Sequence, residues 1–155
     1  MDDISVRDYG ALGDGQDYTA EIQAALNVGG RVYFPSGVYL ISEPLVIKSD
    51  TYIIMESNTI LKRNGEVTMN TSATTPLNYT SGPYAIFTNG HKTDSFTGYN
   101  GNGNITIEGG IIDCDGNSYN SASNGIAFAH GKNIRIKNIT IKNVNYGHHI
   151  EMNSS

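Results

Sequence analysis

Three ionisable side chains near the C-terminus have the types and the spacing that could support proton transfer. They are His148, His149 and Glu151, and a further histidine, His130, precedes them. A histidine beside a glutamate can work as a general acid and base, or can orient a hydroxyl group of a ligand. Alternatively, these side chains are solvated or stacked on neighbouring coils without a chemical role. A zinc site is weakly supported, because the pattern lacks further ligands at suitable spacing.

Two carboxylates, Asp113 and Asp115, form the best pair of acidic residues in the sequence. Because one residue separates them, they could share one face of a strand. With Asn117 they offer oxygen ligands of the kind that Ca²⁺ takes. The stretch Asp-Cys-Asp-Gly-Asn is also typical of a turn, and the EF-hand pattern is absent. A turn is therefore the main expectation. No cofactor is expected, and calcium is the one candidate ion.

Tyrosine outnumbers phenylalanine by 10 to 4, and several tyrosines lie in or beside polar segments. Tyr119 and Tyr146 are close in sequence to the acidic and histidine-containing segments. An exposed tyrosine offers a ligand an apolar ring and a hydroxyl group. Most tyrosines of a small β protein instead cover the edge of the core. Both residues are candidates for a ligand-facing surface.

The composition restricts the classes of fold and partner. The net charge is −5, which argues against nucleic acid as a partner, because a non-specific binder needs a basic surface. No apolar stretch is long enough to span a bilayer, so no membrane span is expected. Cys114 is the single cysteine and cannot form an internal disulfide. The 18 Ile, 18 Gly and 17 Asn indicate a packed β core with many tight turns.

One helix is expected, followed by strands alone. An apolar stripe at helical spacing predicts a helix over residues 17–27, with Asp17 or Thr19 as its N-cap and Gly29 just beyond its end. The segment before it, residues 1–16, is expected to form a strand and a glycine-rich turn. From residue 31 onward, short apolar segments separated by turns predict the strands that position the candidate side chains.

The second half of the chain repeats, which predicts a solenoid. Residues 104–107 recur at 133–136, and residues 125–128 recur at 149–152. In a parallel β-helix, equivalent side chains of successive coils stack at about 4.8 Å. A weaker copy lies at residues 84–87. In this copy, Phe87 is expected to align with Phe128.

Charged residues support the alignment of residues 104–107 with 133–136. The same alignment places Glu108 beside Lys137 and Asp113 beside Lys142 on the outer surface of the coils. Opposite charges at neighbouring outward positions favour such a register.

Three segments carry a resemblance to a known superfamily. They are VRDYGALGDGQDYT from residue 6, VYFPSGVY from residue 32 and IEGGIID from residue 107. Together they resemble the pectate-lyase superfamily. The resemblance implies an all-β fold, a single-stranded right-handed parallel β-helix with an N-terminal capping helix. Residues 1–30 would form the N-terminal strand, turn and helix, and residues 31–155 the first coils. Tyr18 stands where many relatives have a second aspartate, which could alter the helix cap.

A narrower resemblance lies in FAHGKNI from residue 128 and GHHIEMN from residue 147. These segments are similar to β-helix proteins of Gram-positive phages and prophages, including tail spikes and pre-neck appendages. This implies a virion or extracellular domain that recognises, and in some relatives degrades, a cell-surface polysaccharide such as teichoic acid. A homotrimer follows by analogy with phage spikes. The implied glycan-facing residues are Asp113, Asp115, Tyr119, His130, Tyr146, His148, His149 and Glu151.

Two alternatives stay open. The chain could be the N-terminal part of a secreted polygalacturonase-like hydrolase or pectate-lyase-like lyase, with its catalytic residues on later coils. It could also be a purely structural solenoid spacer.

The sequence stops at Ser155, midway through a predicted coil, and an open coil would expose its backbone edge. A truncated part of a longer solenoid, or a second chain over that end, is therefore expected.

Overall fold

The chain winds through three parallel β-sheets in turn. The computed structural model describes residues 3–66, 84–90, 94 and 96–153. Sheet A contains β1 (Ile4–Ser5), β3 (Gly30–Phe34), β6 (Thr51–Met55), β9 (Ile105–Glu108) and β12 (Ile134–Lys137). Sheet B contains β2 (Asp14–Asp17), β4 (Val38–Ile41), β7 (Ile60–Arg63), β10 (Ile111–Asp113) and β13 (Thr140–Lys142). Sheet C contains β5 (Leu45–Val46), β8 (Tyr84–Thr88), β11 (Ser123–Ala129) and β14 (Ile150–Asn153).

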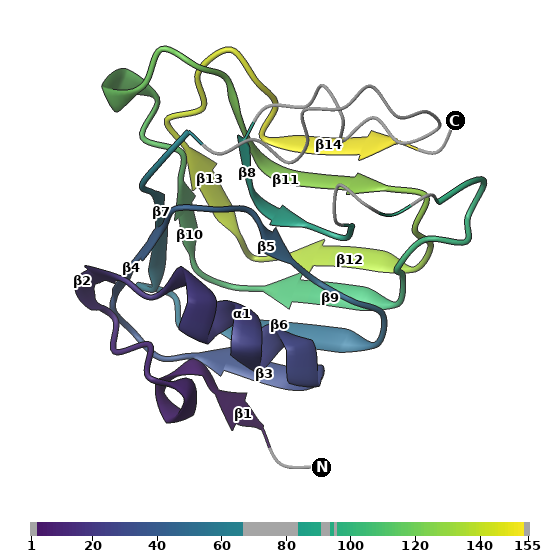
Figure 1. Cartoon of the computed structure of the whole chain (residues 1–155), viewed down its shortest axis with the longest axis horizontal. Coiled ribbons are helices and arrows are strands. Elements are labelled where there is room, and N and C mark those ends of the chain that lie inside the picture. Colours follow the sequence, from purple (N-terminus) through teal and green to yellow (C-terminus); the bar gives the residue numbers. More distant parts are fainter. Residues whose placement is uncertain (1–2, 67–83, 91–93, 95, 154–155) are drawn as a thin grey trace.

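From β3 onward, each coil gives one strand to sheet A, then one to sheet B and one to sheet C, whereas the segment before β3 gives only β1 and β2. Every strand pair in the described part is parallel, and neighbours in a sheet come from successive coils. Figure 1 shows the strands of sheet A stacked one above another, from β1 at the bottom to β12. The predicted parallel β-helix with a capping helix is therefore confirmed.

Two of the three predicted registers are confirmed, and one is wrong. Ile105 pairs with Ile134, and Ile126 pairs with Ile150, as the two clearer repeats predict. Phe87 pairs with Ile126 and not with Phe128, so the true register is shifted by one full alternation. The mistake has a physical cause, since both Ile126 and Phe128 are buried apolar residues on β11. Alternation fixes which face a residue occupies but not which of two such positions it stacks on.

The two charge pairs that β9 and β10 were expected to form differ in outcome. Lys137 Nζ lies 3.6 Å from Glu108 Oε1, which forms the expected ion pair. Lys142 is the register partner of Asp113. The Asp113 carboxylate, however, accepts its hydrogen bonds from Asp115 N and Asn143 Nδ2 and not from Lys142.

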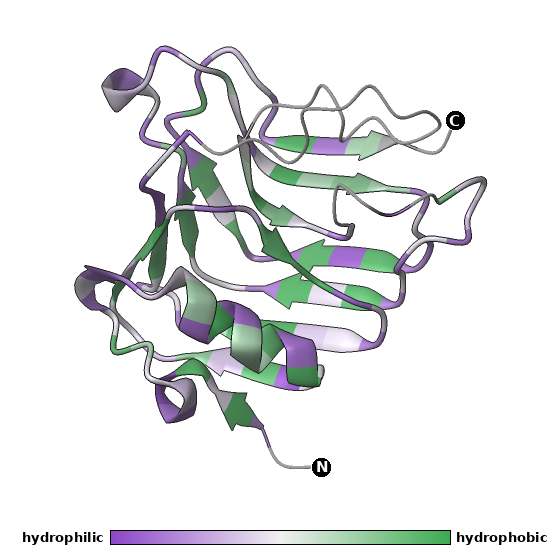
Figure 2. Ribbon diagram, in the orientation of Figure 1, coloured by the Kyte–Doolittle hydropathy of each residue, from purple (hydrophilic) through white to green (hydrophobic). Residues whose placement is uncertain are grey.

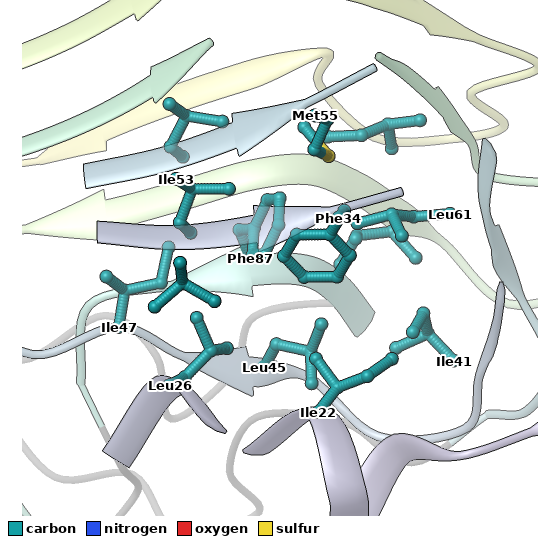
Figure 3. Packing of buried hydrophobic residues seen from close by; sticks show 14 of the residues in the cluster. Ile22, Leu26, Phe34, Ile41, Leu45, Ile47, Ile53, Met55, Leu61 and Phe87 are labelled. Atoms are coloured by element: carbon teal, nitrogen blue, oxygen red, sulfur yellow. The ribbon is translucent and has the colours of Figure 1, made fainter. Parts of the chain in front are cut away.

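The core fills the space between the three sheets. Inward residues of sheet A, such as Val32, Ile53 and Ile107, are fully buried and stack coil on coil. Figure 2 shows the resulting alternation of apolar and polar residues along the strands. Figure 3 shows Phe34, Leu61 and Phe87 converging from different sheets.

Helix α1 (Thr19–Val28) covers the first coil. Ile22 and Leu26 are fully buried and lie against Leu45 of β5 (Figure 3). Strand β5 is one of the two edge strands of sheet C, and Gln23 pairs with its backbone. Gln23 Nε2 donates to Val46 O at 2.9 Å, and Val46 N donates to Gln23 Oε1 at 2.8 Å. The helix thus satisfies an edge that would otherwise present free backbone groups.

The N-terminal segment departs from the expectation of a single strand. The first strand ends at Ser5, Val6–Tyr9 form the 3₁₀ helix η1, and a second strand, β2, begins at Asp14. Ser5 Oγ accepts a hydrogen bond from Arg7 N, and Gly10 ends the turn with φ 101°. A polar cap and a glycine at that φ explain why the strand stops early.

The N-cap of α1 is Tyr18, which makes no side-chain capping bond, although Asp17 or Thr19 was expected. Asp17 Oδ1 nevertheless accepts the Thr19 backbone N–H at 3.0 Å, so the predicted carboxylate acts from one position earlier.

Among the described residues, no helix has the length and apolarity needed to cross a bilayer.

Burial falls toward the C-terminal coil. Ile150 and Met152 align with the buried Ile126 and Phe128, yet they are 43% and 49% exposed. Strand β14 is the edge of sheet C, so only β11 covers these residues among the described strands. Both residues thus have the predicted register partners, but they are not buried as an inward position implies.

Candidate functional site

Two loops that lead from sheet B to sheet C lie against each other, and we call them the paired loops. The first, residues 114–122, joins β10 to β11, and the second, residues 143–149, joins β13 to β14. Gly116 N donates to Asn143 O at 2.8 Å, and Asn145 Nδ2 donates to Gly116 O at 2.9 Å. Figure 1 shows both loops at the upper left. All the predicted site residues except His130 lie in these loops or on the strands beside them.

The acidic pair sits at the start of the first loop and forms a turn. Asp113 Oδ1 accepts hydrogen bonds from Asp115 N and Asn143 Nδ2, both at 2.9 Å. Asp115 has a left-handed φ of 47°, and its Oδ2 lies 3.9 Å from Lys62 Nζ. The Asp113 carboxylate is thus hydrogen-bonded to one residue of each loop, and the Asp115 carboxylate lies near the ammonium group of Lys62. Among the residues that the structure describes, no group of three or more His, Cys, Asp or Glu is placed to hold a metal ion.

A buried arginine fixes the end of the first loop. Arg63 is 1% exposed at the end of β7. Its Nη1 and Nη2 donate to the carbonyl oxygen and the hydroxyl of Ser121, at 3.1 and 2.6 Å. Its guanidinium carbon lies 4.1 Å from the centre of the Tyr119 ring. A cation over a tyrosine ring is attractive, so Arg63 holds Tyr119 half-buried at the edge. Burial raises the pKa of the Tyr119 hydroxyl.

A buried asparagine fixes the second loop and Glu151. Asn124 of β11 is 1% exposed. Its Oδ1 accepts the His148 backbone N–H at 2.7 Å, and its Nδ2 donates to Glu151 Oε2 at 2.7 Å. Gly147 lies so close to Ser123 O that a Cβ would overlap that oxygen. The position of Glu151 is therefore set from the interior.

The remaining residues of the second loop are open to solvent. Tyr146 is 81% exposed and has a φ of 55°. The side chains of His148 and His149 are also exposed. The paired loops thus present two tyrosines, two histidines and held carboxylates along one edge of the solenoid.

His130 does not join this edge. It follows the C-terminal end of β11, whereas His148 and His149 precede β14 beside the start of β11. His130 is fully buried with a φ of 57°, and its Nδ1 lies 2.9 Å from Gly98 O. A buried histidine in a bend cannot face a ligand, so His130 is an interior residue and not part of a glycan-facing surface.

The structure adds Arg63 and Asn124, which were not singled out in the sequence. Each is a polar residue at an inward position of a strand, since Arg63 alternates with Leu61 and Asn124 with Ile126. A polar residue at a buried position is expected to have hydrogen-bond partners. That mismatch with the apolar pattern is the signal that could have identified them.

This edge can bind a polar ligand, and one part of it could move protons. Tyrosine rings offer apolar faces, while histidine, carboxylate and asparagine groups offer donors and acceptors. Glu151 is a carboxylate held beside the histidine-containing loop, which is the geometry that a general acid or base needs.

Solved structures share this architecture. The surface adhesin PfbA of Streptococcus pneumoniae is 26% identical with a TM-score of 0.75, over 98% of this chain and 38% of that one. ORF18 of Geobacillus virus E2 is 22% identical with a TM-score of 0.65, over 88% and 25%. A family 28 exopolygalacturonase of Yersinia enterocolitica is 19% identical with a TM-score of 0.70, over 97% and 41%. The last two likenesses show the fold alone.

Sequence comparison points to relatives of known name. Plasmin and fibronectin-binding protein A of Streptococcus pneumoniae is 33% identical over 173 residues, which cover 98% of this chain. The match spans 22% of that relative's length. Mannuronan C5-epimerase AlgE3 of Azotobacter vinelandii is 49% identical over 65 residues, 34% of this chain and 4% of that enzyme. Residues 4–155 match the family described as rhamnogalacturonase A/epimerase, pectate lyase-like. The chain therefore belongs to this pectate-lyase-like β-helix family.

Proposed function

We propose that this chain forms part of an extracellular or cell-surface β-helix that binds a polysaccharide at the paired loops. The observation that carries the proposal is the pair of tyrosines on two hydrogen-bonded loops. Tyr119 is held by the buried Arg63, and Tyr146 is 81% exposed on the adjoining loop. Tyrosine rings with polar neighbours suit sugar rings, which combine apolar faces with hydroxyl groups.

The relatives support this class of ligand and this location. One is a surface adhesin, and others are named as enzymes that act on mannuronan. The narrower expectation, a phage tail appendage or trimeric spike that recognises teichoic acid, belongs to the same proposal. The shared fold of Geobacillus virus E2 ORF18 is compatible with it.

A second candidate function is modification of the bound polysaccharide. It is favoured by Glu151, whose carboxylate Asn124 holds beside the exposed His148 and His149. A carboxylate fixed from the interior could serve as an acid or a base if a sugar ring lies over this edge. The matched family, described as rhamnogalacturonase A/epimerase, supports enzymatic activity of this kind.

The test is binding of the full chain to immobilised polygalacturonate, mannuronan and wall teichoic acid. Tyr119→Ala and Tyr146→Ala are each expected to weaken binding about tenfold, which corresponds to about 1.4 kcal/mol. Tyr9→Ala is the matched control, because Tyr9 is 38% exposed on η1 and lies outside the paired loops. The binding proposal fails if none of these polysaccharides is retained, or if the three variants bind alike.

Reaction products separate binding from catalysis. New reducing ends would report hydrolysis, unsaturated ends would report elimination, and altered uronate composition by proton NMR would report epimerisation. If any of these appears, Glu151→Gln is expected to abolish product formation while binding is kept. Release of product by Glu151→Gln at the wild-type rate would exclude Glu151 as the acid or base.

A further inference from the structure

A polar pocket lies at the opposite bend, where the chain passes from sheet C to sheet A. Its volume is about 250 Å³, and none of its lining residues belongs to the paired loops. The side chains that line it are those of Ser49, Asp50, Tyr99, Asn104, Lys132 and Asn133.

Three of these residues stack because they occupy the same position in successive coils. Asp50, Asn104 and Asn133 directly precede β6, β9 and β12 of sheet A. All three have left-handed φ values, 66°, 54° and 59°. Asparagine and aspartate tolerate this conformation better than most residues, since their short polar side chains hydrogen-bond locally. The result is a column of carboxylate and amide groups at one wall of the pocket.

The pocket is built from the interior outward. Asn89 is fully buried, and its Nδ2 donates to Asn102 O at 2.8 Å. Asn102 in turn donates to Asn89 O at 2.9 Å and accepts from Ser49 N at 3.1 Å. Ser49 Oγ accepts from Gly103 N at 3.0 Å. These hydrogen bonds connect the buried Asn89 to Ser49 and Gly103, which line the pocket. The pocket is therefore preorganised before a ligand binds.

Two glycines that line the pocket lie close to neighbouring parts of the chain. A Cβ on Gly103 would overlap Lys132 O, and a Cβ on Gly101 would lie 2.8 Å from Phe96. The absence of a Cβ therefore allows the backbone to approach the neighbouring coil closely at this point.

Several polar groups of the pocket are available to a ligand. Asn104 Nδ2 donates to Asp50 Oδ1 at 2.8 Å, and this leaves Asp50 Oδ2 without a partner among the described residues. The side chains of Lys132 and Asn133 make no hydrogen bond or ion pair within the part of the chain that the structure describes. Tyr99 is 61% exposed at the rim.

We propose that this pocket binds a single pyranose ring. The tyrosine ring supplies an apolar face, while Asp50 and the amide groups supply acceptors and donors for neighbouring hydroxyls. The volume lies below the range of about 300–1,000 Å³ that holds drug-sized ligands, which suits one sugar unit and not an oligosaccharide. This site is independent of the paired loops, because it lies at the other end of the sheet C strands.

The test is a titration of the full chain, labelled with ¹⁵N, with methyl α-D-galactopyranoside and with its uronate analogue. The side-chain amide signals of Asn104 and Asn133 should shift with a Kd on the order of 1 mM. Tyr99→Ala and Asp50→Asn should each weaken binding about tenfold. Asn at position 50 keeps the left-handed backbone, as Asn104 and Asn133 already do, so this variant is expected to fold.

Matched controls and a third variant complete the test. Tyr9→Ala and Asp8→Asn alter exposed residues of η1 and should leave the titration unchanged. If the uronate analogue binds more tightly than methyl α-D-galactopyranoside, and Lys132→Ala abolishes this difference, the site is supported and is selective for an acidic sugar. Equal affinities would support recognition through hydroxyls alone. The proposal is overturned if neither glycoside shifts these amides at tens of millimolar, or if Tyr99→Ala and Asp50→Asn bind like wild type.

Discussion

At the scale of single residues, a few buried polar side chains decide where the surface groups lie. Arg63 and Asn124 each occupy an inward strand position and reach the loops with their polar atoms. Burying such groups is costly unless they are hydrogen-bonded. Their bonds therefore restrict the loops to one arrangement, and the exposed tyrosines and histidines inherit that arrangement.

Replacement of Arg63 by methionine tests this dependence. Arg63→Met keeps an unbranched side chain but removes the hydrogen bonds to Gly65 and Ser121 and the cation over Tyr119. Because Ser121 O and Gly65 O lose a charged donor, we expect the free energy of unfolding to fall by about 3 kcal/mol. Urea unfolding measures the change. Lys62→Met, at the neighbouring half-buried position, should cost under about 1 kcal/mol; equal costs would contradict the anchoring role.

Asp17 predicts a pH dependence at the start of α1. Burial raises its pKa, but hydrogen bonds from Asn64 and Thr19 outweigh this, and the folded pKa lies below the ordinary value of 3.8. Asp17 therefore stabilises the fold above that value, and the contribution is lost as the pH falls through the folded pKa. Asp17→Asn should lower stability by about 1 kcal/mol near neutral pH, and the difference should disappear in acid.

Urea unfolding between about pH 2 and 7 checks the Asp17 prediction. Asp8→Asn, an exposed change on η1, should run parallel to wild type over the whole range. A deficit of Asp17→Asn that stays constant down to the lowest pH would exclude a carboxylate effect.

The exposed residues of the candidate site were easier to predict from the sequence than the residues that hold them. Polar loop residues are expected to be exposed to solvent, and this holds for Tyr146, His148 and His149. His130 has the same residue type as two of them, but it follows a strand that is buried along its whole length. No feature of the sequence near His130 distinguishes the two cases, because burial there depends on contacts between distant coils.

At the scale of elements, the capping helix and the edge strand act as one unit. Gln23 forms both an acceptor and a donor bond with Val46, as a neighbouring strand would. The apolar stripe of the helix is evident from the sequence, and its burial is confirmed. The amide pair was not predictable, since nothing in a single helix shows which strand edge it will cover.

Gln23→Ala should destabilise the first coil. It leaves Val46 N and Val46 O without partners at a half-buried position, so we expect a loss of about 1–2 kcal/mol. Thermal and urea unfolding both report it. Gln16→Ala changes an exposed glutamine of β2 and should have little effect, because only the backbone N–H of Gln16, and not its side chain, is hydrogen-bonded to Asp14. If Gln23→Ala were as stable as Gln16→Ala, the amide pair would have no energetic role.

The strand register was predictable wherever the repeat carried charges or matched apolar residues. Ile105 with Ile134 and Glu108 with Lys137 both follow from one alignment. The partner of Phe87 was not predictable, because strand β8 and its partner β11 lack such a second marker. The loops between coils also vary in length, which removes any fixed spacing from which the register could be read.

At the scale of the whole molecule, burial is uneven along the solenoid. Inward residues of the middle coils are fully buried, whereas Ile150 and Met152 of the last described strand are about half exposed. In a solenoid each coil gains most of its stability from its two neighbours. Stability of this chain should therefore decrease from β6 and β9 toward β14.

Native-state hydrogen exchange measures this gradient. Amide hydrogens of β12, β13 and β14 should exchange about tenfold or more faster than those of β6 and β9, because local opening costs less where fewer contacts are broken. Uniform protection across all coils would show that the chain unfolds in one step and would contradict the gradient. A second probe is limited proteolysis, with first cuts expected in residues 130–153.

The covered edge at the first coil gives the solenoid a direction. Strands β1 and β5 are very short, β2 pairs irregularly with β4, and Gln23 occupies the backbone of β5. An incoming strand of another molecule therefore meets no regular backbone template at this pole. Self-association by strand addition at the first coil is accordingly disfavoured.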